Sequence, residues 1–138
     1  MAAMKHARNP GSELDLGRLQ SLAEELGSPE PALRFLAKYL AMLPQRIERI
    51  VHAVDEHDAT ETTTAVLSLK ISSSMVGAME TEHQCRAIES MIRADHFDDA
   101  AHALPALRQT ADRCLASRSD LIRAARSSLT RHRGFFRS

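Results

Sequence analysis

Two acid-x-x-His spacings in the sequence could hold a metal ion. Glu80 and His83 are three residues apart, and so are Asp99 and His102. On a helix this spacing places the carboxylate and the imidazole on one face, as in bundles that hold carboxylate-bridged metals. Such a centre also needs inward glutamates from two further helices, and the long apolar stripe upstream supplies none. Glu80 and His83 also lie off the apolar stripe of their own segment. We therefore expect them to face water, and we predict neither a metal nor a cofactor.

Other catalytic patterns are missing from the sequence. It has no glycine-rich phosphate loop, no cysteine cluster and no Ser-His-Asp order on strands. The sequence contains two cysteines, Cys85 and Cys114, and we see no apolar segment that resembles a leader. Both observations favour a reducing cytoplasm over a disulfide framework. We expect both to be small core residues, and we predict that the protein is not an enzyme.

Composition argues against nucleic acid and membrane as partners. Eighteen basic and eighteen acidic side chains cancel, so no global charge attracts polyanions. From Arg108 onward eight arginines face two aspartates, which we interpret as a solvated helical face. One Tyr, four Phe and no Trp leave little aromatic surface for stacking bases. No apolar run approaches the roughly 18 uncharged residues that a membrane span needs.

The length of 138 residues suits one domain. Residues 1–12 lack periodicity and contain Pro10 and Gly11, so we expect a disordered N-terminal tail. We place the domain at residues 13–131 and a basic C-terminal tail at residues 132–138. A short first helix is predicted from an N-cap at Asp15 to a stop at Gly27.

The clearest periodic signal is an apolar stripe from Leu33 to His57 with alternating spacings of three and four residues. Pro44 lies inside it and predicts a kink, because it removes one hydrogen bond without any nearby stop signal. A capping box of Asp58 and Glu61 then opens another helix, which we expect to end at Gly77.

The remaining chain predicts two more helices, one over residues 78–94 and one long helix over residues 95–130. No segment alternates with period two. The sequence therefore predicts an all-α protein, an antiparallel four-helix bundle with an additional short N-terminal helix.

The run AVLSLKISSSMVGA, residues 65–78, resembles the signature of the histidine phosphotransfer (HPt) domain. That signature is an accepting His followed by x-Leu-Lys-Gly-Ser-Ser, with a Gly-Ala pair closing the helix. Upstream LDLGRLQSLAEELG and LAMLPQRI, and the segment from Cys85 to Glu89, resemble the family too, so the likeness covers roughly residues 14–130. The matching motif positions are Leu69, Lys70, Ser72, Ser73, Gly77 and Ala78.

Two positions depart from the signature. Leu67 stands where the family has the accepting His, and Ile71 stands where it has the Gly. In the family the imidazole attacks an aspartyl phosphate on a receiver domain, and nucleophilic attack needs a lone pair. Leucine has none. The resemblance therefore implies a noncatalytic, pseudo-phosphotransfer module of a two-component system. Its implied partner is a response-regulator receiver domain or a histidine kinase.

Angles around the helix place Leu67, Ile71 and Met75 on an outward face, where contiguous apolar area commonly marks a partner site. Packing under the first helix or a tail is the alternative for this row. The same patch could also close a homodimer, and a relocated histidine such as His83 could keep the relay active. The predicted partner-binding residues are Leu67, Ser68, Lys70, Ile71, Ser74, Met75 and Glu89, with Lys70 and Glu89 as an exposed pair.

Overall fold

The computed structural model describes residues 13–131, and this part of the chain contains helices and no strand. The predicted tails, residues 1–12 and 132–138, lie outside the described residues. The helices are α2 (Leu16–Leu26), α3 (Pro29–Asp55), α4 (Ala59–Val76), α5 (Met79–Arg93), α6 (Phe97–Ala116) and α7 (Arg118–Arg131).

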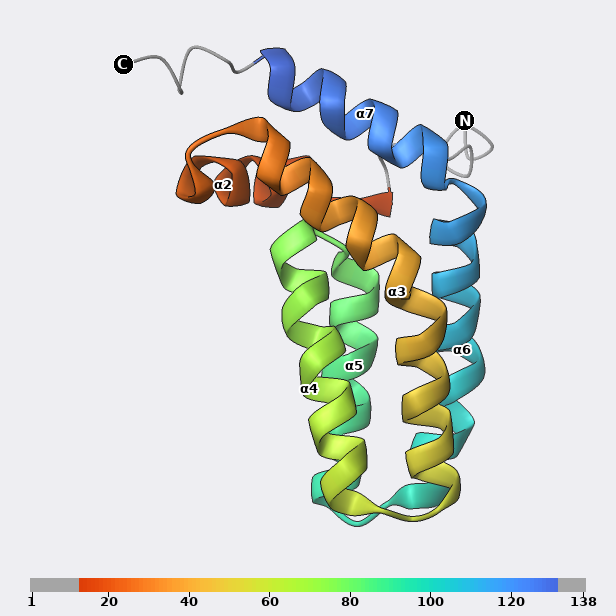
Figure 1. Ribbon diagram of the computed structural model, residues 1–138. Coiled ribbons are helices and arrows are strands. Elements are labelled where there is room, and N and C mark those ends of the chain that lie inside the picture. The colour runs from red at the N-terminus through yellow and green to blue at the C-terminus, as the bar shows by residue number, and fades with distance from the viewer. Residues whose placement is uncertain (1–12, 132–138) are drawn as a thin grey trace, which may run out of the picture.

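Four helices form the bundle that the periodicity predicts. Figure 1 shows α4, α5, α6 and the second half of α3 running alongside one another, while α2 and α7 lie across one end. The neighbouring helices around the bundle are α3 and α4, α4 and α5, α5 and α6, and α6 and α3. The helix α6 is therefore diagonally opposite α4. None of the helices between residues 13 and 131 is long and apolar enough to cross a membrane.

The long helix α3 keeps its continuity through Pro44. It changes direction about midway along, so that its first half runs obliquely over the bundle and its second half descends within it (Figure 1). The stripe from Leu33 to Val54 is buried as predicted, but the inclusion of His57 was wrong. The helix ends at Asp55, and His57 sits in the following loop with φ of 55°, its ring 4.8 Å from that of Phe97.

The prediction of one helix over residues 95–130 was wrong. The first part, α6, ends at Ala116, and a turn at Ser117 starts α7. This turn brings Leu121, Ala125 and Leu129 onto α2 and α3, where all three are fully buried. The sequence does not indicate this break, because neither Gly nor Pro stands at it. In the structure, the Leu121 amide donates to the Ser117 carbonyl over 2.8 Å, so the new helix starts directly at the turn.

Most helix ends follow their predicted caps. The Asp15 side chain accepts from the Gly17 amide, and the Asp58 side chain accepts from the Glu61 amide. Only half of the capping box forms, because the Glu61 carboxylate binds Arg49 instead of reaching back. The Asp15 amide also donates to the Gly77 carbonyl over 2.7 Å, which ties the start of α2 to the end of α4.

Candidate functional site

The inward face of α4 is the one that the helical angles predict. Val66, Leu69, Ser73 and Val76 are fully buried. The Ser73 hydroxyl is 2.7 Å from the hydroxyl of Tyr39 on α3, so this buried serine has a polar partner. Burial raises the pKa of Tyr39 far above its ordinary value, and the phenol stays neutral. These contacts fix the rotation of α4 about its axis and thereby decide which side chains face outward.

The outward face of α4 carries a row of exposed apolar side chains, which we call the α4 row: Leu67, Ile71 and Met75. Their exposed fractions are 39%, 51% and 37%. They are one turn apart, so they lie next to one another along the helix. Together with Leu26 they are the exposed large apolar side chains of residues 13–131. The row is therefore not packed under α2, which was the alternative for that part of the chain.

The serines beside the row are half-buried and hydrogen-bonded. The Arg46 guanidinium on α3 donates to the Ser68 hydroxyl over 3.1 Å and to the Ser72 hydroxyl over 3.0 Å. Arg18 on α2 donates to the Ser74 hydroxyl over 2.8 Å. Sequence reasoning missed both arginines, because neither lies near α4 in the sequence and no periodic pattern links them to it.

On the other side of the row, Lys70 pairs with Glu89 on α5. The Nζ to Oε1 distance is 2.7 Å, and the second oxygen of Glu89 accepts from Arg93 over 2.9 Å. The expectation of an exposed pair was wrong, because the side chains of Lys70 and Glu89 are only 19% and 7% exposed. The hydrogen bond from Lys70 lowers the pKa of Glu89 below its ordinary value, and burial only partly opposes this. Because both carboxylate oxygens of Glu89 are bound, a partner at this surface would contact Lys70 and Arg93 more than Glu89 itself.

This pair predicts a pH-dependent contribution to stability. We expect Glu89→Gln to lower the free energy of unfolding at pH 7 by about 1–2 kcal/mol, because it leaves Lys70 without its charged partner. A lowered pKa stabilises the fold above the unfolded value near 4.5, and this contribution is lost as the pH falls through the folded pKa. Urea unfolding of both proteins should therefore show a difference that shrinks below about pH 4. Glu48→Gln, which breaks an exposed pair with Arg108, should change little at either pH. An equal loss at all pH values would contradict an electrostatic role.

The candidate metal residues do not converge. Glu80 and His83 are exposed, and Glu80 is held by Arg113 over 2.7 Å. His102 is exposed on α6. Within residues 13–131 no group of three His, Cys, Asp or Glu side chains could hold a metal ion. Among the described residues, no side chain hydrogen-bonds the exposed His83 ring, so no neighbour orients this ring for chemistry.

Both cysteines are buried and free, which confirms their interpretation as core residues. Burial raises the pKa of the Cys85 thiol to about 12 and that of the Cys114 thiol to about 11. Because the thiolate is the nucleophile, neither cysteine is poised for reaction near neutral pH.

Comparison with known proteins agrees with this architecture. The family model of the Hpt domain matches residues 34–117, more than half of the chain. One solved structure that it resembles is the HPT domain of an Hpt sensor hybrid histidine kinase from Shewanella. The TM-score is 0.59 and the identity 21%, over 86% of this chain and 95% of the other. At this identity the likeness concerns the fold. Comparison with curated proteins gives no match.

The chain belongs to the HPt domain family. This confirms the family that the motif at residues 65–78 suggested. HPt domains are modules of phosphorelay signalling that interact with other relay proteins and carry phosphoryl groups without acting as catalysts. Within this family, the α4 row and the charged groups on either side of it are the candidate functional site.

Proposed function

We propose that this HPt domain is a pseudo-phosphotransfer module of a cytoplasmic two-component system. It binds a protein partner, a response-regulator receiver domain, without carrying phosphate. The observation that carries the proposal is Leu67: an exposed leucine occupies the acceptor position of the motif, while Lys70, Ser72 and Ser73 stand at their matching positions.

The chemistry of the acceptor position supports this function. Attack on phosphorus needs a lone pair presented in line with the leaving oxygen. The Leu67 side chain has only carbon and hydrogen, so no rotamer and no pH supplies one. One turn later, Ile71 puts a β-branched side chain where the family signature has Gly. The surface that would receive phosphate is thus converted into an apolar surface.

The size of the α4 row is compatible with a specific complex. Fully burying one such side chain contributes about 1.5–3 kcal/mol, and 37–51% of each one is still exposed. Covering the row would therefore add a few kcal/mol before the costs of association are subtracted. Polar groups at its edges, such as Lys70 and Ser68, would supply orientation.

Binding to receivers is tested by a charge placed in the row. We expect Leu67→Asp to weaken the complex with the cognate receiver about 10- to 100-fold in isothermal titration calorimetry, because the carboxylate must be desolvated at the interface. Gln109→Asp adds the same charge on α6, which is diagonally opposite α4 in the bundle, and should leave binding unchanged. Failure of every receiver of the host organism to bind the wild-type protein would refute the proposed partner.

Self-association is the second candidate, because three exposed apolar side chains in one row could also meet their own copy across a two-fold axis. Light scattering separates the two candidates. A dimer that Leu67→Asp converts to a monomer would support self-association, whereas a wild-type monomer over the full concentration range would count against it.

A further inference from the structure

Arg46 on α3 is a half-buried cation that contacts only neutral oxygens. Its Nη1 donates to the hydroxyls of Ser68 and Ser72 and, over 3.4 Å, to the Ser68 carbonyl. Its Nε is shielded from solvent and has no hydrogen-bond partner. Among residues 13–131 no carboxylate lies within ion-pair distance of this guanidinium. Proteins rarely leave a buried charge without a counter-charge.

A comparison within the molecule makes the contrast sharper. Arg113 on α6 is also half-buried and also has a shielded Nε, but its Nη2 binds the Glu80 carboxylate over 2.7 Å. Arg49, one turn after Arg46, shares its charge with Glu61. The guanidinium of Arg46, unlike those of Arg113 and Arg49, therefore has no carboxylate partner among the described residues.

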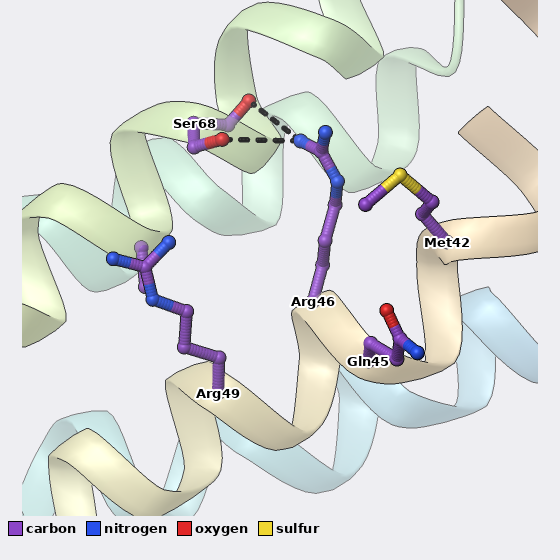
Figure 2. A pocket seen from close by; sticks show the side chains of 6 residues that line it. Met42, Gln45, Arg46, Arg49 and Ser68 are labelled. Atoms are coloured by element: carbon purple, nitrogen blue, oxygen red, sulfur yellow. Dashed lines mark hydrogen bonds between the residues drawn. The ribbon is translucent and has the colours of Figure 1, made fainter. Parts of the chain in front are cut away.

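Arg46 lines a groove of about 190 Å³ between α3 and α4. Figure 2 shows Arg46 and Arg49 both reaching from α3 toward α4, with Arg46 bonded to Ser68. Three further residues, Met42, Gln45 and Ala65, complete the lining. Ser68 follows Leu67 directly in the sequence, so the groove runs beside the α4 row.

We propose that this groove binds a carboxylate, supplied by an acidic side chain of the partner that covers the α4 row. This inference rests on the proposed function and names the chemistry of the partner: an acidic residue next to apolar ones. Nη2 of Arg46 makes no hydrogen bond within the described residues, so it can donate a charge-assisted hydrogen bond to a carboxylate oxygen. Phosphate fits less well, because the groove lies beside the middle turns of two helices and offers no free backbone amides.

The site itself can be tested without any partner. We expect sodium acetate, titrated at constant ionic strength, to shift the Arg46 Nε–H resonance in ¹H–¹⁵N spectra and to saturate on the order of 10 mM. The Nε–H of Arg113, shielded but already paired, is the internal control and should not move. A linear drift of both resonances, or no shift at Arg46, would overturn the proposal. Saturation by inorganic phosphate but not by acetate would overturn it as well.

The role of the groove in partner binding needs variants. We expect Arg46→Gln to weaken receiver binding about tenfold or more, while Arg108→Gln on α6 changes nothing. Because Arg46 also links α3 to α4, Arg49→Gln provides a variant that removes none of the bonds to Ser68 and Ser72, and it should weaken binding to a smaller extent. Thermal unfolding checks that each variant is folded.

The experiments can refute the proposed function and the carboxylate site independently of each other. Acetate saturation at Arg46 with no receiver bound would support the carboxylate site and refute the receiver as partner. Receiver binding that is indifferent to both Arg46→Gln and Arg49→Gln would leave the proposed function standing and overturn this inference.

Discussion

Leu67→His is expected to turn this protein into an acceptor of phosphoryl groups from a phosphorylated receiver domain. The substitution places an imidazole on the outward face of α4, where position 67 is already exposed. Lys70, one turn further on, could then balance part of the phosphoryl charge. The measurement is transfer of radioactive phosphate from the receiver to the variant, where wild type should take up none and Leu67→His should take up a stoichiometric amount.

Ile71 should limit the rate of this engineered transfer. Its β-branched side chain is 51% exposed beside position 67 and would crowd an approaching receiver. We therefore expect Leu67→His with Ile71→Gly to transfer faster than Leu67→His alone, despite a stability cost of about 1 kcal/mol for a glycine in a helix. If neither variant is labelled by a receiver that binds it, α4 does not present position 67 as we describe.

Gly77→Ala is expected to be the most damaging single substitution that adds only one carbon. Gly77 has φ of 84°, and an added Cβ would overlap the backbone of Asp15. The alanine would strain its own backbone and break the hydrogen bond from the Asp15 amide, which together should cost about 2–4 kcal/mol. Thermal unfolding followed by circular dichroism should show a midpoint lower by roughly 10 °C.

Gly27→Ala is the matched control for this effect. Gly27 has a similar φ of 86°, but no other atom lies near its added Cβ. The Gly27→Ala variant should therefore lose only about 1 kcal/mol of unfolding free energy, the cost of holding alanine at a positive φ. The difference between the two variants therefore measures the close approach of α2 to the end of α4. Equal losses would show that this approach contributes nothing.

Much of this structure could be predicted from local signals in the sequence. Asp15, Gly27 and Asp58 act at the helix ends where their side chains or their glycine backbone predicted. The inward stripe of α4 followed from helical angles alone, because a bundle helix buries one continuous face. The family followed from the motif, since its residues are set by spacing within a single helix.

The features that escaped prediction depend on contacts between distant segments. The break at Ser117 is decided by the burial of Leu121 and Leu129 against α2 and α3, not by a stop signal at the turn. The Glu61 side chain does not complete the predicted capping box, because it forms an ion pair with Arg49 on α3. Arg46 could not be predicted as part of the site either, because only the packing of α3 on α4 places it beside Ser68.

The most direct test of the proposed function is phosphate transfer to the wild-type protein. The 138-residue protein is incubated with each receiver domain of its host, which carries labelled phosphate on its aspartyl group, and the protein is then assayed for acid-labile, alkali-stable label. We predict that a receiver binds while no histidine of the protein acquires phosphate. Stoichiometric phosphohistidine on the wild-type chain, for example at His83, would contradict the central claim.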